Sequence, residues 1–154
     1  MAKKSLKFLI VEDDDDHAEL IISTIEDLGV AESIDRLDNG EDAVNYLKSE
    51  TQSPSAKKPD IVLMDLKLPK LSGIEVLKAV RCESELAAIP IVMLSTSPSQ
   101  RDIRDAYLNH ANAYLVKPME FEELSAMVAD LVNFWGKWNT TPVINDDSSL
   151  RGGN

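Results

Sequence analysis

Short runs of apolar residues alternate along this chain with longer stretches in which apolar residues recur every three or four positions. A run of four or five apolar residues is typical of a strand that is covered on both faces, as in a parallel sheet. On this basis the sequence predicts five strands, of which the second is the weakest: Leu6–Val11, Ser33–Leu37, Asp60–Met64, Ile89–Leu94 and Asn112–Val116.

A helical pattern with one apolar face follows each of these strands. Helices are expected from about Asp15, over Ala43–Leu47, Ile74–Val80 and Ile103–Tyr107, and from about Glu120. Five strand–helix units in succession predict an α/β domain, in which helices cover both faces of a parallel sheet.

We expect residues 1–138 to form this domain. Ser49–Lys58 is polar and contains a proline, which predicts a surface loop. Residues 139–154 are polar with Pro and Gly, and they are expected to form a mobile tail. Tyr107 is expected to contact the core.

The last expected helix carries more apolar surface than one buried face needs. Its two adjacent apolar stripes comprise Leu124, Met127, Val128, Leu131, Val132, Phe134, Trp135 and Trp138. In one interpretation both tryptophan rings fold back on the domain. In the other, which we favour, Phe134, Trp135 and Trp138 form a homodimer contact, because aromatic side chains are frequent anchors at interfaces.

Polar residues stand where the expected strands end. Glu12 and Asp13 follow the first strand, Asp65 the third, Ser95 the fourth and Lys117 the fifth. Because open parallel sheets bind ligands at the carboxyl ends of their strands, these side chains are expected to share one crevice.

The chemistry of this residue set points to a phosphoryl group and a divalent cation. Three carboxylates close together repel one another and raise their own pKa values, and a divalent cation relieves that repulsion. Oxygen ligands with vacant positions suit Mg²⁺, and the charge of Lys117 then brings the loaded site close to neutrality. Ser95 can donate to an anionic oxygen. Phosphoryl transfer needs such positioning and charge neutralisation, and Asp65 is the candidate to accept the group as an acyl phosphate.

The same residues resemble the motifs of bacterial response-regulator receiver domains. These motifs are Val11-Glu12-Asp13-Asp14, Met64-Asp65 with Leu68-Pro69 and Gly73, Leu94-Ser95-Thr96, and Tyr114-Leu115-Val116-Lys117-Pro118. They occur in the family's order over roughly residues 5–135. The resemblance implies a doubly wound, flavodoxin-like (βα)5 domain with strand order 2-1-3-4-5.

The resemblance also implies roles for the site residues. Asp65 would be phosphorylated by a histidine kinase or a histidine phosphotransfer protein. Asp13, Asp65 and the main-chain carbonyl of Lys67 would ligate Mg²⁺, and Glu12 would act through a metal-bound water. Ser95 and Lys117 would contact the phosphoryl oxygens.

A switch is implied as well. Ser95 and Tyr114 match the family's switch positions, and we expect the Tyr114 ring to turn inward when Asp65 is phosphorylated. The bond before Pro118 is commonly cis in the family. The pair Phe134-Trp135, the long loop and the absence of an output domain resemble the single-domain regulators of bacterial phytochromes. The kinase would then be a phytochrome-type photoreceptor.

Composition narrows the range of partners. The chain has 27 acidic and 16 basic residues, with a net charge of −11. Such a surface repels phosphate backbones and anionic lipid, so we expect neither nucleic-acid nor membrane binding. One cysteine, Cys82, permits no internal disulfide, and we expect a cytoplasmic protein. His17 and His110 lack the spacing of metal ligands and are expected at the surface.

Two other classes of protein stay open. A magnesium-dependent phosphatase with an aspartate nucleophile usually carries a second aspartate two residues after the first, where this chain has Lys67. A receiver-like adaptor that is never phosphorylated would not need the complete site. We favour a stand-alone regulator that catalyses only its own phosphorylation and dephosphorylation.

Overall fold

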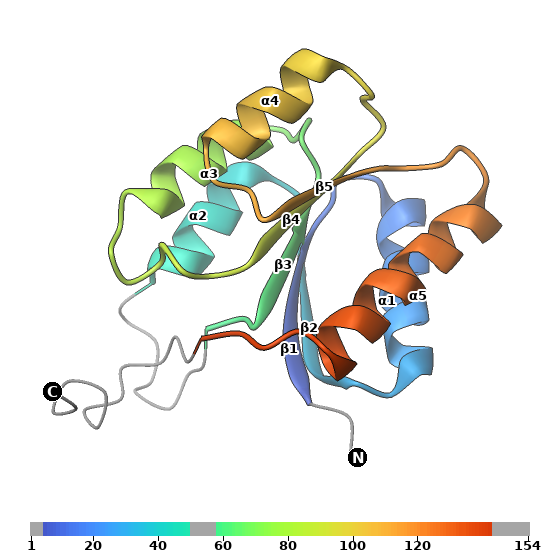
Figure 1. Ribbon diagram of the computed structural model, residues 1–154. Coiled ribbons are helices and arrows are strands. Elements are labelled where there is room, and N and C mark those ends of the chain that lie inside the picture. Colours follow the sequence, from blue (N-terminus) through green and yellow to red (C-terminus); the bar gives the residue numbers. More distant parts are fainter. Residues whose placement is uncertain (1–4, 50–57, 143–154) are drawn as a thin grey trace, which may run out of the picture.

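Within residues 5–49 and 58–142, the part of the chain that this computed structural model describes, five parallel strands form one sheet. They are β1 (Leu6–Val11), β2 (Ala31–Leu37), β3 (Ile61–Met64), β4 (Ile91–Ser95) and β5 (Ala113–Val116). Their order in the sheet is β2-β1-β3-β4-β5 (Figure 1). The predicted fold class and strand order are confirmed, although β2 begins two residues earlier than predicted.

Helices follow the strands and cover both faces of the sheet. They are α1 (Asp15–Leu28), α2 (Gly40–Lys48), α3 (Gly73–Arg81), α4 (Gln100–Leu108) and α5 (Phe121–Lys137). Helices α1 and α5 lie side by side on one face, and α2, α3 and α4 cover the other (Figure 1). The alternation of apolar runs and helical patterns predicted helices on both faces, but not which helices share a face.

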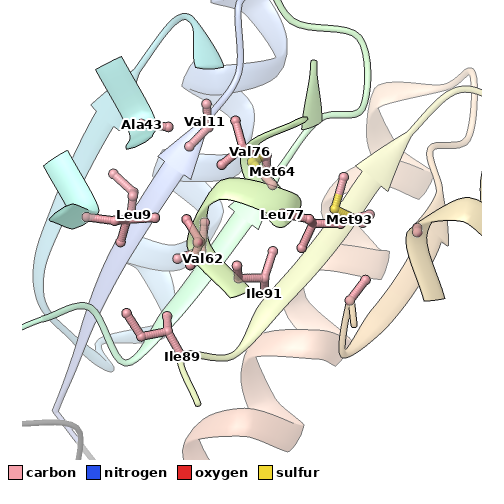
Figure 2. Packing of buried hydrophobic residues seen from close by; sticks show 14 of the residues in the cluster. Leu9, Val11, Ala43, Val62, Met64, Val76, Leu77, Ile89, Ile91 and Met93 are labelled. Carbon is pink, nitrogen blue, oxygen red and sulfur yellow. The ribbon is translucent and has the colours of Figure 1, made fainter. Parts of the chain in front are cut away.

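The core is divided between the two faces of the sheet, since successive strand residues point to opposite sides. Leu9, Val62 and Ile91 share one cluster with residues of α2 and α3 (Figure 2). Phe8 and Leu63 share the other with residues of α1 and α5. Burying each such side chain contributes about 1.5–3 kcal/mol, so the strands are held in register and their polar ends are held in place.

Gly73 draws the loop after β3 tightly against the strand ends. Its N–H donates to the carbonyl of Leu66 at 2.7 Å. A Cβ atom at this position would lie 2.5 Å from the main-chain oxygen of Asp65 and 2.8 Å from Cε of Met93, so the close approach requires a residue without a side chain. Ser72 then starts α3 with a capping box. The loop that follows Asp65 is therefore short and well fixed.

The two stripes of α5 have different surroundings. Trp135 is 8 % exposed and lies in the core with residues of α1, whereas Phe134 and Trp138 are 51 % and 72 % exposed. Of the two tryptophans, Trp135 therefore folds back on the domain. Phe134 and Trp138 form the outward-facing aromatic surface.

One residue prediction on α4 was wrong. Tyr107 is 50 % exposed, because Ala106 is the residue that α4 turns toward the core. Most of the predicted loop and tail, residues 50–57 and 143–154, lies outside the described residues. Among the helices of the described part, none is long and apolar enough to cross a membrane.

Candidate phosphoryl-acceptor and metal site

Three carboxylates meet where β1 and β3 end. Glu12 and Asp13 follow β1, and Asp65 follows β3, its neighbour in the sheet. One carboxylate oxygen from each lies within 4.8 Å of the others. Glu12 is buried, Asp65 is half-buried and Asp13 is exposed, so the cluster opens to solvent on the Asp13 side. This all-oxygen donor set, open on one side, fits a hard divalent cation that keeps some of its waters.

Both oxygens of Asp65 have partners. Oδ1 accepts from the main-chain N–H groups of Leu66 at 2.6 Å and Lys67 at 3.4 Å. Oδ2 accepts from Nζ of Lys117 at 2.9 Å. The Asp65 N–H donates to the carbonyl of Val11 at 3.0 Å, which fixes the residue to the end of β1. The carboxylate is thus aimed into the crevice from a well-held backbone.

Lys117 brings a buried positive charge into this acidic cluster. Its side chain is 1 % exposed, and its Nζ donates to Glu12 as well as to Asp65. Burial alone would lower the pKa of Lys117, but the hydrogen bond to Glu12 and the charges of Asp65 and Glu12 outweigh it and raise that pKa. The side chain therefore keeps its charge and can serve as a fixed donor to an anion.

Glu12 is a buried carboxylate whose pKa is raised above its ordinary value. Burial raises its pKa to about 7; the hydrogen bond from Lys117 opposes this shift, and the charge of Asp65 adds to it. Its main-chain carbonyl accepts from Arg36 at 2.8 and 3.1 Å, and Arg36 also pairs with Asp15 at 2.8 Å. A cation at the cluster would favour the charged form of Glu12.

The segment after β5 deviates from the family pattern at one bond. The Lys117 N–H donates to the carbonyl of Ser95 at 2.7 Å, which joins the ends of β5 and β4. Within the described residues no peptide bond is cis, so the bond before Pro118 is trans here, whereas it is commonly cis in the family.

Ser95 and Tyr114 are connected through Ser97. Oγ of Ser95, a buried residue, accepts from the Ser97 N–H at 3.1 Å. The Tyr114 hydroxyl donates to the Ser97 carbonyl at 2.8 Å, and the Ser97 hydroxyl donates to Asp102 of α4 at 2.5 Å. A movement of the Ser95 hydroxyl would therefore disturb the residue that also holds the Tyr114 ring and the start of α4.

His17 belongs to the site, although its lack of metal-ligand spacing predicted a surface residue. Its Nδ1 lies 3.2 Å from Nζ of Lys117 and 4.0 Å from Glu12, and its side chain is 23 % exposed. Metal-ligand spacing could not identify it, since it contacts a lysine. Its position, on the first turn of the helix that begins just after Glu12 and Asp13, was the available signal.

This chain belongs to the response regulator receiver domain family, whose model matches residues 8–129. Probable methanogenesis regulatory protein FilR2 of Methanothrix harundinacea is 42 % identical over 134 residues, which cover 87 % of this chain and 86 % of that protein. Response regulator Rcp1 of Synechocystis is 31 % identical over 134 residues, which cover 87 % and 91 %.

Solved structures agree with this assignment. The phosphorylated cyanobacterial phytochrome response regulator RcpA matches with a TM-score of 0.84 at 33 % identity, over 90 % of this chain and 99 % of that chain. The Mn²⁺-bound form of Rcp1 matches with a TM-score of 0.79 at 30 % identity, over 89 % and 99 %. The predicted family is confirmed. Receiver domains are signalling proteins that bind a divalent metal and take a phosphoryl group from histidine kinases, and the acidic cluster fits such a metal.

Proposed function

We propose that this chain is a response regulator that is switched by phosphorylation of Asp65. The observation that carries the proposal is the position of the buried Lys117 ammonium, 2.9 Å from Oδ2 of Asp65 and beside a cluster of acidic side chains. The ammonium group of Lys117 thus places a positive charge beside Asp65, where a phosphoryl group would add negative charge.

The metal in this proposal is Mg²⁺. Asp13, Asp65 and the main-chain carbonyl of Lys67 would hold it, with Glu12 acting through a water. When bound, it would neutralise charge on the phosphoryl oxygens. The donor set of carboxylates and the opening on the Asp13 side support this choice over a closed site with nitrogen or sulfur ligands.

In the transfer step, a carboxylate oxygen of Asp65 attacks the phosphorus of a phosphohistidine. A P–O bond forms and the P–N bond breaks, and the histidine nitrogen keeps the electron pair. Lys117 donates to one phosphoryl oxygen and Ser95 to another, so the charge carried by the group is met by donors already in place. Hydrolysis by water later restores the carboxylate.

The signal would leave the site through Ser95 and Tyr114. If Ser95 Oγ turns toward the phosphoryl group, it withdraws from the Ser97 N–H, and the Ser97 carbonyl that holds Tyr114 shifts with it. Because the Tyr114 ring already packs against the core and its hydroxyl already donates to Ser97, this shift would reposition the ring and alter the surface that α4 and β5 present to a partner protein. Comparing the NMR signals of Tyr114 with and without a phosphoryl mimic tests this step; an unchanged ring environment would count against it.

The donor in this proposal is a sensor kinase of the phytochrome type, or a histidine phosphotransfer protein, in the cytoplasm. The similarity to RcpA, a phytochrome response regulator, over 90 % of this chain supports the photoreceptor. The acidic surface supports a protein partner over nucleic acid or membrane.

Exposed aromatic rings on α5 support a homodimer. Phe134 and Trp138, four residues apart, are both exposed, whereas Trp135 is buried and its ring meets that of Phe134 edge-on. Light scattering after size exclusion tests this: wild type should elute as a dimer and Trp138→Ala as a monomer, with the exposed Met119→Ala as the matched control. A monomeric wild type at high concentration would refute the dimer.

The test of the main proposal is phosphotransfer to wild type and to Asp65→Asn. Acetyl phosphate with Mg²⁺, or a phosphorylated kinase, should add one phosphoryl group to wild type and to an exposed-carboxylate control, Asp27→Asn, but none to Asp65→Asn. Intact-mass spectrometry measures the product. Labelling of Asp65→Asn to the wild-type level would refute the proposal. No labelling of any variant would favour the adaptor, and multiple turnover on a small phosphate ester would favour the phosphatase.

A further inference from the structure

Lys117 has a third partner besides the two carboxylates, and that partner is His17. An ammonium group has three N–H donors and no acceptor. In this site Glu12, Asp65 and Nδ1 of His17 stand within hydrogen-bonding reach of Nζ. Each donor of the buried ammonium thus has one acceptor.

The imidazole is held for this contact. Because the ammonium can only donate, Nδ1 must accept, and the ring proton then sits on Nε2. The ring of Phe121, the first residue of α5, meets the imidazole edge-on, with centroids 5.9 Å apart and planes at 77°. The start of α5 therefore supports the imidazole ring through this ring contact.

We propose that His17 is a positioning residue for Lys117, which keeps the ammonium beside Asp65 while the carboxylates engage a cation and a phosphoryl group. Glu12 and Asp65 both belong to the acidic cluster, so their contacts with Lys117 weaken when they turn to other partners. His17 carries no carboxylate and has no such second task. Without His17, the flexible four-carbon side chain of Lys117 would let the ammonium group move away from Asp65, where the phosphoryl group brings negative charge.

This inference rests on the proposed phosphorylation of Asp65, and the experiment separates the two. His17→Leu and His17→Ala remove the acceptor, while His17→Asn keeps an acceptor close to the position of Nδ1. His110→Asn, at a position with φ of 68° that asparagine tolerates, is the matched control for the chain's other histidine.

Two readouts are needed. The first is the ¹³Cε signal of Lys117 in the metal-free protein, which should shift in His17→Leu and His17→Ala but stay near the wild-type position in His17→Asn and His110→Asn. The second is the rate of phosphorylation by acetyl phosphate at saturating Mg²⁺. We expect about a tenfold loss in His17→Leu and His17→Ala, as for a hydrogen bond to a charged group, and recovery to within about threefold in His17→Asn.

The outcomes differ clearly. Wild-type rates in His17→Leu and His17→Ala, with an unmoved Lys117 signal, would overturn the positioning role. Equal losses in His17→Asn and His17→Ala would also overturn it, because ring volume would then matter and the acceptor would not. If wild type itself takes no phosphoryl group on Asp65, the proposed function fails, and the Lys117 signal alone still decides whether His17 holds the ammonium.

Discussion

Replacing Gly73 by alanine should disturb the phosphoryl site without altering a charged group. The new methyl group would stand 2.5 Å from the main-chain oxygen of Asp65 and 3.0 Å from Cα of Leu66, and both are backbone atoms that cannot swing aside. The loop must therefore move, and with it the carboxylate that it carries.

The expected cost follows from the size of the clash. Forcing an extra methyl group into a packed position costs about 1–3 kcal/mol. In a chain of this length each kcal/mol lowers Tm by about 2–4 °C. Gly73→Ala should therefore melt about 2–12 °C below wild type, and its phosphorylation by acetyl phosphate should slow because Asp65 is displaced from Lys117.

Gly136→Ala is the matched control. A Cβ there would meet Cγ1 of Val30 at 3.5 Å, an ordinary contact, and alanine suits a helix interior better than glycine by about 0.5–1 kcal/mol. Thermal unfolding followed by circular dichroism compares the three proteins. If Gly73→Ala melts with wild type and is phosphorylated at the same rate, the close approach of the loop to Asp65 is not as described.

Three further predictions concern the charged cluster and the switch. Lys117→Met should bind Mg²⁺ more tightly, because a competing positive charge is removed, and calorimetry measures this affinity. Its phosphorylation, followed by mass spectrometry, should be about a hundredfold slower than that of wild type. Weaker Mg²⁺ binding in Lys117→Met would contradict the expected gain in affinity. Burial raises the pKa of Glu12 to about 7, above its ordinary 4.5, so the folded chain holds this proton more tightly than the unfolded chain. The stability that Glu12 contributes is present below about pH 4.5 and is lost as pH rises through about 7. Added Mg²⁺ should therefore raise Tm more at pH 8 than at pH 5.5. An equal rise in Tm at the two pH values would refute the raised pKa of Glu12. Tyr114→Phe should lose about 0.5–1.5 kcal/mol in urea unfolding, because its hydroxyl donates to Ser97, whereas the exposed Tyr107→Phe should lose nothing.

The sequence was sufficient to predict the fold because its signals were local and repeated. Apolar runs such as Ile61–Met64, which is buried on both faces, predicted the five strands. The polar residues at the strand ends predicted the site. Glu12 and Lys117 are 105 positions apart in the chain, yet both follow strands of one parallel sheet, so the topology alone placed them at the same edge.

Details that depend on tertiary contacts were not available from the pattern. Helical periodicity does not say which of Ala106 and Tyr107 turns inward, since both adjoin the apolar stripe. Trp135 in α5 and Trp138 just after it likewise divide between core and surface, according to where the helix meets α1. His17 escaped notice because its partner is an ammonium on a distant strand end, and no spacing rule connects a histidine to a lysine 100 residues later.

Helix α5 runs from the ring that touches His17 to the exposed aromatic residues at its far end. At 1.5 Å per residue, its 17 residues make a rod about 25 Å long. If the helix tilted by a few degrees where Phe121 meets the crevice, the displacement at Trp138 would be on the order of one or two ångströms. A change at the crevice would then reach the aromatic residues at the far end of the molecule without any segment having to melt.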